Sequence, residues 1–467
     1  MRSVESKLFR SYDVRGLYPS QLNESIVRDI AHAFFLFLKS PRCIVVGRDV
    51  RDSGKPLSSA LIETFRALGV SVIDIGIVPA EVFYFSLVHF SASGGVFVSA
   101  SHNPAGWNGL NFAGYGAVGI SHVSGLAAIE RIFLRLRNAA AKNIPSVSPQ
   151  KGSLQVVDIS KPYLSFFKSL VRSFPRPIRP LRIVIDGNFG ASAQWFSRIA
   201  RVSGYPIHLY PIRNDFRGDV PQKKPNPLFS SNRQQLQRAV VSHQADFGVA
   251  WDLDGDRCFF VDHAGRFIQP PYISMLLTEA VLRRYPHSLI LCDNRFCLGV
   301  RSVARRMSGR FAFTKPGMTV VSGMLSRRRG VFACEASAHY YFSDTFYRDS
   351  GFLPIFYITS LFIDQNVSLQ SLVAPLQKSY PVSAEINFPL SSPLVAKKIL
   401  TSIAAKYRTG TISFFEGLSV SFKHWRFVVR ISSTEPLLRL TVEATSRPVL
   451  RKELALLRGR IRLLVSG

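Results

Sequence analysis

Three aspartates at alternate positions are the clearest chemical signal in this 467-residue sequence. Asp252, Asp254 and Asp256 directly follow the apolar run FGVAW. Three carboxylates this close repel one another unless a cation lies among them, and such hard oxygen ligands favour Mg²⁺. An EF-hand calcium loop needs Gly after the third acid and Glu at its twelfth position, where this sequence has Arg257 and His263. We therefore expect a magnesium site, with a solvated acidic turn as the alternative.

A serine and a histidine follow a second apolar strand, in the stretch VFVSASHNPAGWNG at 96–109. The Asn-Pro and Asn-Gly pairs of this stretch account for its turns. They do not account for Ser101 and His102. Taken alone, the pair is equally compatible with a turn cap beside a surface histidine.

The stretch RISSTEPLLR at 430–439 has the composition of a phosphate site. Arg430, Ser432, Ser433 and Thr434 lie in a predicted loop between two strand-like runs. A guanidinium fork with several hydroxyls and backbone amides satisfies the oxygens of a phosphate. A polar hairpin turn is the alternative.

The stretch ACEASAHYYF at 333–342 offers three polar groups at alternate positions. Glu335, Ser337 and His339 supply a carboxylate, a hydroxyl and an imidazole, which an extended chain would present on one side. Such a set is suited to sugar hydroxyls.

Together these four motifs resemble the α-D-phosphohexomutase family, most closely its bacterial phosphomannomutase branch, which includes the phosphomannomutase/phosphoglucomutase enzymes. The resemblance extends from FRSYDVRG at 9–16 to RISSTEPLLRLTVEA at 430–444. It implies four domains around a central cleft. They would carry, in order, a phosphoserine loop, a Mg²⁺ loop, a sugar-recognition loop and a phosphate-binding loop.

The resemblance assigns a role to each motif. Ser101 is implied to carry the phosphoryl group and to contact one Mg²⁺ per chain together with Asp252, Asp254 and Asp256. The residues implied to line the transfer site are Arg15, His102, Arg257, Arg295 and His339. Those implied to bind the sugar or its second phosphate are Glu335, Ser337, Arg430, Ser432, Ser433 and Thr434.

The implied reaction interconverts mannose 6-phosphate and mannose 1-phosphate, with glucose phosphates as further substrates. A hexose 1,6-bisphosphate is the implied intermediate and activator. The sequence departs from the family pattern at four positions: Asn111 replaces a lysine, Met318 replaces a histidine or other polar residue, and Leu253 and Cys334 replace glycines. A catalytically weakened homologue is therefore an alternative. A phosphoglucosamine mutase is another, because the sequence does not separate mannose, glucose and glucosamine phosphates as substrates. A further alternative is a haloacid-dehalogenase-like enzyme with Asp252 as nucleophile.

The elements that position these motifs are predicted from strand-helix-strand patterns. Residues 42–76, 181–211 and 287–317 each read as a βαβ unit, which implies a mostly parallel sheet with functional loops at the carboxyl ends of its strands. After about residue 380 the alternation indicates antiparallel strands. We expect an α/β fold of three similar mixed-sheet domains, with boundaries 1–150, 151–262 and 263–378, and a C-terminal α+β domain at 379–467.

Composition limits the partners. The formal charge is +29, from 59 Lys and Arg against 30 Asp and Glu, which attracts anions. No nucleic-acid-binding signature accompanies it, so we expect a small sugar phosphate and no nucleic acid.

The apolar runs at 30–38 and 351–363 are shorter than the roughly 20 residues of a membrane span, and read as buried helices. Five cysteines without a CxxC pair and no signal-peptide pattern indicate a cytoplasmic protein. We expect a monomer or weak homodimer.

Overall fold

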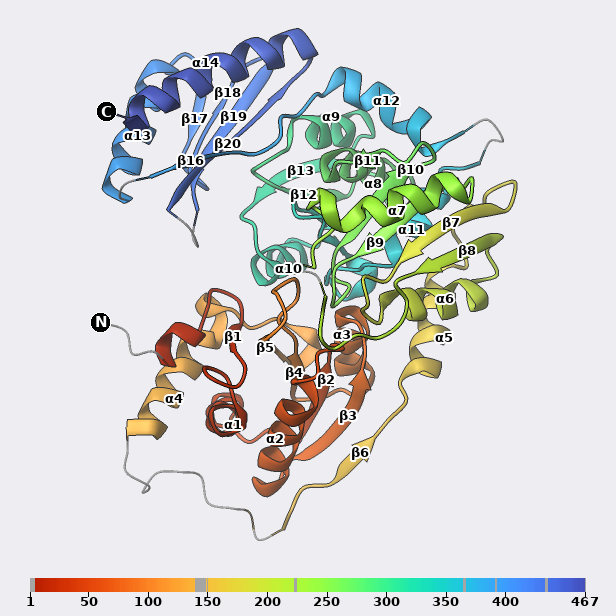
Figure 1. The fold of residues 1–467 in the computed structure, drawn as a ribbon, viewed down its shortest axis with the longest axis vertical. Coiled ribbons are helices and arrows are strands. Elements are labelled where there is room, and N and C mark those ends of the chain that lie inside the picture. The colour runs from red at the N-terminus through yellow and green to blue at the C-terminus, as the bar shows by residue number, and fades with distance from the viewer. Residues whose placement is uncertain are drawn as a thin grey trace. The chain divides into compact units, whose positions relative to one another are not determined.

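The computed structural model describes residues 5–138, 148, 150–221, 225–363, 367–390, 393–432 and 436–466. The chain divides into two compact units, and Figure 1 labels their helices and strands. The first comprises Met1–Phe267, Gly317–Arg327 and His339–Gln365. The second comprises Ile268–Pro316, Arg328–Ala338 and Asn366–Gly467.

The first unit begins with a six-stranded mixed sheet. Its strands are β1 (Val14–Leu17), β2 (Cys43–Arg48), β3 (Ser71–Ile77), β4 (Gly94–Val98), β5 (Trp107–Gly114) and β6 (Leu154–Val156), in the order β1-β5-β4-β2-β3-β6. β2 pairs in parallel with β3 and β4, whereas β5 is antiparallel to β4 and β1. The associated helices are α1 (Glu24–Leu38), α2 (Gly54–Ala67), α3 (Ala80–His89) and α4 (Ala127–Asn138). The βαβ unit expected at 42–76 is confirmed as β2-α2-β3.

Helix α1 shows how local sequence sets an element's ends. The side chain of Asn23 accepts a hydrogen bond from the backbone N–H of Ile26, which caps the helix, and Lys39 ends it in a left-handed conformation. Ile30 and Phe34 are buried, but Leu36 is 40% exposed. The expected buried helix is thus present in the form of an amphipathic helix, which exposes Leu36.

A second sheet completes the frame of the first unit. Its strands are β7 (Leu181–Asp186), β8 (Ile207–Ile212), β9 (Phe247–Trp251), β10 (Cys258–Asp262) and β11 (Phe267–Ile268), in the order β11-β10-β9-β7-β8. The helices are α5 (Ser160–Val171), α6 (Ser192–Ser203) and α7 (Ser230–Ser242). β7 pairs in parallel with β8 and β9, and β10 returns antiparallel to β9. The expected unit at 181–211 is confirmed as β7-α6-β8.

An aromatic cluster packs β9 against α11 (Leu353–Thr359), which follows β15 (Tyr340–Phe342) in the chain. The ring of Trp251 lies 5.6 Å from that of Phe196 and 5.8 Å from that of Phe352. The indole N–H of Trp251 donates to the carbonyl of Gly351 over 2.7 Å. Every residue of α11 is buried, as predicted for the run at 351–363. This packing fixes the end of β9, from which the three aspartates emerge.

The second unit contains the third βαβ motif. Strands β12 (Leu289–Asp293), β13 (Arg310–Thr314) and β14 (Phe332–Cys334) pair in parallel, with β12 in the middle. α9 (Leu298–Arg306) links β12 to β13, and α8 (Pro270–Arg284) and α12 (Leu369–Ser379) pack nearby. The expected unit at 287–317 is confirmed.

The same unit ends in an antiparallel sheet. Its strands are β16 (Ile386–Pro389), β17 (Thr411–Ser413), β18 (Leu418–Ser421), β19 (Trp425–Ile431) and β20 (Leu437–Ala444), in the order β16-β20-β19-β18-β17. The helices are α13 (Pro393–Lys406) and α14 (Arg447–Ser466). The predicted change from parallel to antiparallel pairing after residue 380 is confirmed.

A buried ion pair joins β19 and β20 to the start of α9. Glu443 accepts hydrogen bonds from the backbone N–H groups of Cys297 and Leu298, and from Nη1 of Arg426 over 2.8 Å. Arg426 also donates to the backbone and side-chain oxygens of Asn294. Arg426 and Glu443 are each 2% exposed. A carboxylate at a helix N-terminus is favoured by the helix dipole.

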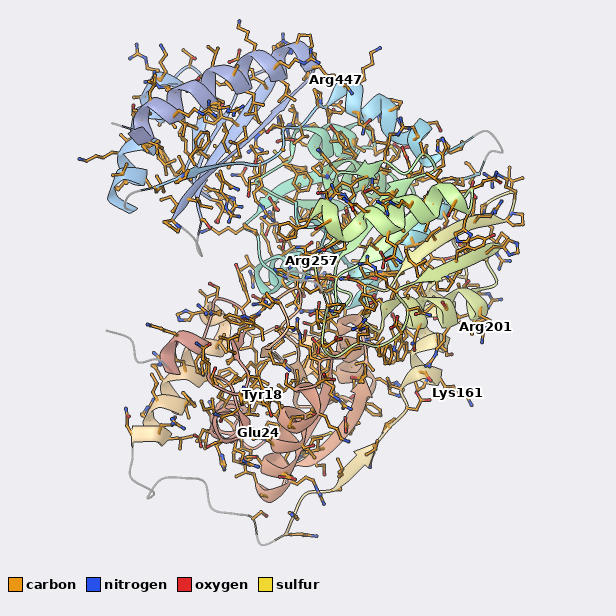
Figure 2. The ribbon with its side chains drawn as sticks, viewed as in Figure 1. Tyr18, Glu24, Lys161, Arg201, Arg257 and Arg447 are labelled. Carbon is orange, nitrogen blue, oxygen red and sulfur yellow. The ribbon has the colours of Figure 1, made fainter. Side chains whose placement is uncertain are left out.

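Many other cationic side chains lie at the surface. Lys161 on α5, Arg201 on α6 and Arg447 on α14 are all exposed (Figure 2).

All five cysteines are reduced thiols; Cys43 is half-buried, and Cys258, Cys292, Cys297 and Cys334 are buried. Among the described residues, no helix combines the length and apolar character that crossing a membrane requires.

Candidate active site

Ser101 lies in the loop that follows β4, next to the acids that follow β9. Its φ of 49° places it in the left-handed region, and it is 4% exposed. Its Oγ is 3.3 Å from Oδ2 of Asp252 and 3.1 Å from Nδ1 of His102. Its backbone N–H donates to Oγ of Ser99, which in turn donates to Oδ2 of Asp254 over 2.9 Å. The two strand ends are thus connected through the serine.

The three predicted aspartates converge. One carboxylate oxygen of each of Asp252, Asp254 and Asp256 lies within 4.8 Å of the others, and all three residues are buried. Burial, followed by the charge of a neighbouring aspartate, raises the pKa of Asp252 to about 6 and those of Asp254 and Asp256 to about 7. Three acids that resist ionisation together are stabilised by a cation.

The donor set fits a hard metal ion. Oδ1 of Asp254 and Oδ1 of Asp256 are buried without a hydrogen-bond partner. Buried carboxylate oxygens without partners are costly unless an ion or water satisfies them. Gly255 allows the tight loop, because its φ is +77° and a Cβ there would lie 2.1 Å from Oγ of Ser192. The acidic loop can therefore hold a metal ion.

Two arginines and a histidine border the acids. Arg15 donates through Nη1 to the carbonyl of Ala100 over 2.9 Å, and its Nε contacts Asp13. Arg257 lies 3.4 Å from Oδ2 of Asp252. The field of Arg257, then burial, then Arg15 lowers the pKa of His102 well below its ordinary value. His102 is therefore neutral at pH 7.

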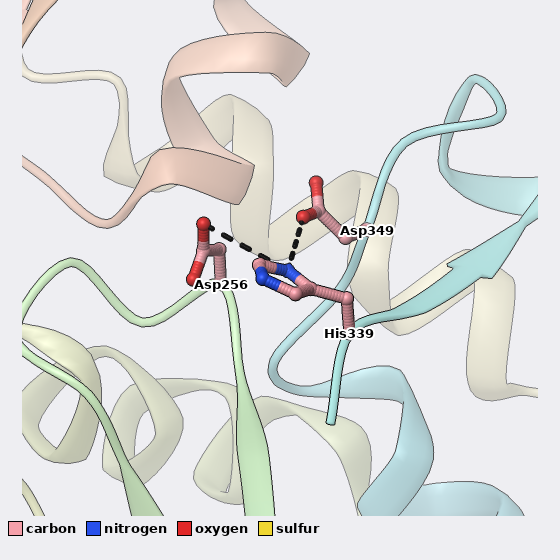
Figure 3. Close-up of side chains that lie close together, drawn as sticks. All are labelled: Asp256, His339 and Asp349. Atoms are coloured by element: carbon pink, nitrogen blue, oxygen red, sulfur yellow. Dashed lines mark hydrogen bonds and ion pairs between the residues drawn. The ribbon is translucent and has the colours of Figure 1, made fainter. Parts of the chain in front are cut away.

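His339 lies between two carboxylates (Figure 3). Its Nδ1 is 2.8 Å from Oδ2 of Asp349 and 3.9 Å from Oδ2 of Asp256. Burial opposes protonation, but the charges of Asp256 and Asp349 outweigh it and raise the pKa of His339 to about 9. Nε of Arg257 lies 3.0 Å from Nε2 of the ring, a contact that favours the neutral form. In this geometry Nε2 accepts from Arg257 and Nδ1 faces Asp349, so partners on both sides hold the ring in one orientation.

The three polar groups of the loop at 335–339 were predicted to lie on one side, and this prediction was wrong. Ala338 adopts φ 68°, which breaks the extended alternation. Glu335 and Ser337 belong to the second unit, where Oγ of Ser337 donates to Oε2 of Glu335 over 3.0 Å. His339 belongs to the first unit and faces Asp349. In the second unit, Nη2 of Arg295 lies 3.3 Å from Oε2 of Glu335.

The predicted phosphate motif is partly described. Arg430 is the sixth residue of β19 and not a loop residue; it is paired across the ladder with Arg439. Both arginines contact Glu385, with N–O distances of 2.8 and 3.2 Å. Ser432 is buried at the end of the strand. Ser433 and Thr434 lie outside the described residues.

Several residues in this region were missed at the level of sequence. Ser99 lies between Ser101 and Asp254, Asp349 faces His339, and Asp49 pairs with Arg51 behind the Ser101 loop. Asp49 and Arg51 follow the carboxyl end of β2. Functional loops are expected at the carboxyl ends of parallel strands, so the same expectation would have indicated these two residues. Asp349 has no comparable signal, because it lies beyond the short 3₁₀ helix Ser343–Thr345 and does not directly follow a strand.

Comparison with known families matches the chain along nearly its whole length. Models described as phosphoglucomutase/phosphomannomutase α/β/α domains I, II and III match residues 6–139, 161–265 and 270–380, and the C-terminal domain model matches 385–458. The chain belongs to the phosphoglucomutase/phosphomannomutase family. The four-domain order expected from the sequence is confirmed, whereas the boundaries at 150, 262 and 378 stay predictions.

Relatives of this phosphohexomutase are similar over almost their full length. A phosphomannomutase of Escherichia coli is 35% identical over 93% of this chain and 94% of the relative. A protein of Xanthomonas campestris described as phosphohexose mutases is 35% identical over 93% and 94%. The crystal structure of a phosphoglucomutase/phosphomannomutase family protein from Burkholderia thailandensis aligns with a TM-score of 0.86 and 26% identity, covering 100% of this chain and 99% of that one. The protein is an intramolecular phosphotransferase that acts on sugar phosphates.

Two departures from the family pattern have defined surroundings. Nδ2 of Asn111 donates to the carbonyl of Ser99 over 3.3 Å, so a neutral amide lies beside the Ser101 loop. Sδ of Met318, the first residue of α10 (Met318–Arg327), accepts a hydrogen bond from the hydroxyl of Tyr84 over 3.3 Å. Neither side chain can carry a proton in place of the residues usual in the family.

Proposed function

We propose that this phosphohexomutase interconverts mannose 6-phosphate and mannose 1-phosphate, and also the corresponding glucose phosphates, through phosphorylated Ser101 and a hexose 1,6-bisphosphate. The observation that carries the proposal is the placement of the Ser101 hydroxyl 3.3 Å from Asp252, within a group of three buried acids. The names of the relatives, phosphomannomutase in Escherichia coli and Vibrio cholerae, support mannose as the first substrate to test.

The residues of the first unit would carry the phosphoryl transfer. The P–O bond of phosphoserine breaks as the substrate hydroxyl oxygen forms a new one and loses its proton, and Ser101 Oγ takes up a proton. Neutral His102, 3.1 Å from Oγ, would accept the proton of the substrate hydroxyl and pass it to Oγ. Arg15 and Arg257 would bind the phosphoryl oxygens as charged donors. Mg²⁺ held by the three acids and Ser101 would neutralise charge on the transferred group.

The residues of the second unit would recognise the sugar and its other phosphate. Glu335 and Ser337 offer an acceptor and a hydroxyl to two sugar hydroxyls, and Arg295 lies beside Glu335. Arg430 would bind the phosphate that is not being transferred, with Ser432, Ser433 and Thr434. Because the bisphosphate must present each phosphate in turn, few sugar contacts of this kind would serve both orientations.

The test is a coupled assay of the purified protein with mannose 1-phosphate and glucose 1-phosphate, Mg²⁺ and a catalytic amount of hexose 1,6-bisphosphate. Intact mass and peptide mapping should show an acid-stable phosphate on Ser101. Ser101→Ala should abolish both signals, while Ser169→Ala, on the exposed part of α5, should leave them unchanged. A hydroxylamine-labile phosphate on Asp252 would instead indicate dehalogenase-like chemistry and contradict the proposal.

A weakened mutase is the second candidate, and Asn111 is the observation that favours it. Loss of a charged group near a reacting oxygen costs on the order of 10² in rate at comparable sites. Asn111→Lys should therefore raise kcat about 10-fold or more in a weakened enzyme. No gain would show that Arg15, His102 and Arg295 already supply what the lysine does elsewhere.

A further inference from the structure

The loop that carries Ser101 needs support from outside itself. Ser101 has φ 49° and Gly106 has φ 80°, so the loop contains one strained non-glycine residue. Its far end, Ala105 to Trp107, borders a cavity of about 310 Å³ that is also lined by Tyr18, Asp52 and Ser53. Close packing therefore cannot fix the loop on that side.

A buried arginine supplies most of this support, in addition to the hydrogen bond from Arg15 to the carbonyl of Ala100. Arg51 is 4% exposed and follows β2. Its Nη2 donates to the carbonyls of Ser101 (2.8 Å) and Asn103 (2.6 Å). Its Nη1 donates to the carbonyls of Pro104 (2.9 Å) and Trp107 (3.1 Å).

The fifth N–H group of the Arg51 guanidinium also has a hydrogen-bond partner. Nε of Arg51 contacts Oδ2 of Asp49 over 3.2 Å, and Oδ1 of Asp49 accepts from the backbone N–H of Arg51 over 3.0 Å. A guanidinium has five N–H groups in a fixed plane, and here each one has a partner. Four of the five donate to carbonyls within the seven residues 101–107, so four carbonyls of this segment converge on one rigid group.

We propose that Arg51 is the positioning residue of the phosphoryl-transfer loop, which holds Ser101 in its left-handed conformation with Oγ directed towards Asp252. The inference rests on the proposed function, because it concerns the same serine. Ser99 holds the amide of Ser101, and Arg51 holds its carbonyl. Both peptide groups that flank the nucleophile are thereby fixed, independently of whether Ser101 carries a phosphate.

Lysine should not replace Arg51. An ammonium is a point charge with three donors, and it cannot reach four carbonyls and a carboxylate spread over a planar fork. A loop displaced by about 1 Å at the reacting atom typically loses on the order of 10²-fold in rate. Because Arg51 touches no group proposed to bind the sugar, the loss should fall on phosphoryl transfer and not on sugar binding.

The experiment compares Arg51→Lys with Arg213→Lys in the full-length protein. Arg213 is a matched control: it is also largely buried, contacts Asp186 through two nitrogens and donates to the carbonyl of Asn232, away from Ser101. The measurements are the rate of Ser101 phosphorylation by glucose 1,6-bisphosphate, followed by intact mass after rapid quench, kcat and KM for mannose 1-phosphate, and Tm.

Arg51→Lys should lower the phosphorylation rate and kcat by about 100-fold while KM changes by less than about 3-fold. Arg213→Lys should lower Tm by a similar amount and leave the rates within about 3-fold. Phosphorylation of Arg51→Lys at the wild-type rate, or equal rate losses in both variants, would overturn the inference. A wild-type protein that never gains phosphate on Ser101 would instead overturn the proposed function.

Asp49→Asn tests the same inference if Arg51→Lys does not fold. It keeps the arginine and removes the charge of the carboxylate that accepts from Nε and from the backbone N–H of Arg51. The phosphorylation rate should fall by about 10-fold with an unchanged KM, since Arg51 loses one charged hydrogen-bond partner. An unchanged rate would overturn the inference.

Discussion

Replacing Glu443 by glutamine should destabilise the second unit through the buried cation that it leaves behind. Glu443 is 2% exposed and accepts from the amides of Cys297 and Leu298 and from Arg426. Glutamine keeps one acceptor oxygen for the start of α9 but turns an NH₂ group or a neutral oxygen towards the guanidinium. Removing one partner of a buried ion pair typically costs about 3 to 5 kcal/mol. Arg426 keeps its two bonds to Asn294, so we expect about 3 kcal/mol.

The double-mutant cycle with Arg426→Met makes this estimate specific. Arg426→Met alone leaves a carboxylate that two helix amides still bind, so its cost should also be about 3 kcal/mol. In Glu443→Gln/Arg426→Met neither charge is left unpaired, so the two costs should fall short of additivity by about 2 kcal/mol. The measurement is urea unfolding followed by circular dichroism. Additive costs, or a cost of Glu443→Gln below about 1 kcal/mol, would refute the reasoning.

Further predictions concern pH, metal and phosphate. Burial raises the pKa of Glu81 from 4.5 to about 7, so protonation of its carboxyl stabilises the fold fully below pH 4.5, and this contribution is lost as the pH rises through 7. In the wild type the free energy of unfolding should therefore fall across this range, and Glu81→Gln should remove roughly 3 kcal/mol of that fall. Urea unfolding at each pH measures the difference. Mg²⁺ should raise the Tm of the wild type, and Asp254→Asn should abolish both this shift and phosphoryl transfer; a wild-type shift retained in the variant would contradict the metal site. Arg430→Ala should lower kcat/KM for the 1-phosphate and the 6-phosphate alike by roughly 10- to 100-fold, whereas a loss for one substrate alone would argue against a shared distal site.

The sequence was sufficient to predict residues whose place depends on local pattern. Ser101 and Asp252 each follow a fully buried strand, β4 of the first sheet and β9 of the second, and the loop after the carboxyl end of such a strand is the expected place for a functional residue. The three βαβ units were predicted for the same reason, because alternation of apolar strand and helix is a local property.

Residues whose place depends on a distant partner were not predictable in this way. The left-handed conformation of Ala338 separates Ser337 from His339, and alanine gives no local sign of it, as glycine or asparagine would. Asp349 acquires its importance only by facing His339 across the turn. The partners of Arg51 are backbone carbonyls about 50 residues away, which carry no sequence signature at all.

The native cysteines can report on local and global unfolding of each unit through their reaction with a thiol reagent. Cys43 is half-buried and should react with a thiol reagent in the native state, whereas Cys258 in the first unit and Cys297 in the second are fully buried, and burial raises the pKa of both thiols, to about 12 for Cys297. Their labelling therefore requires local or global unfolding. Peptide-resolved labelling rates report separately on the transient opening of each unit, without any substitution in the chain.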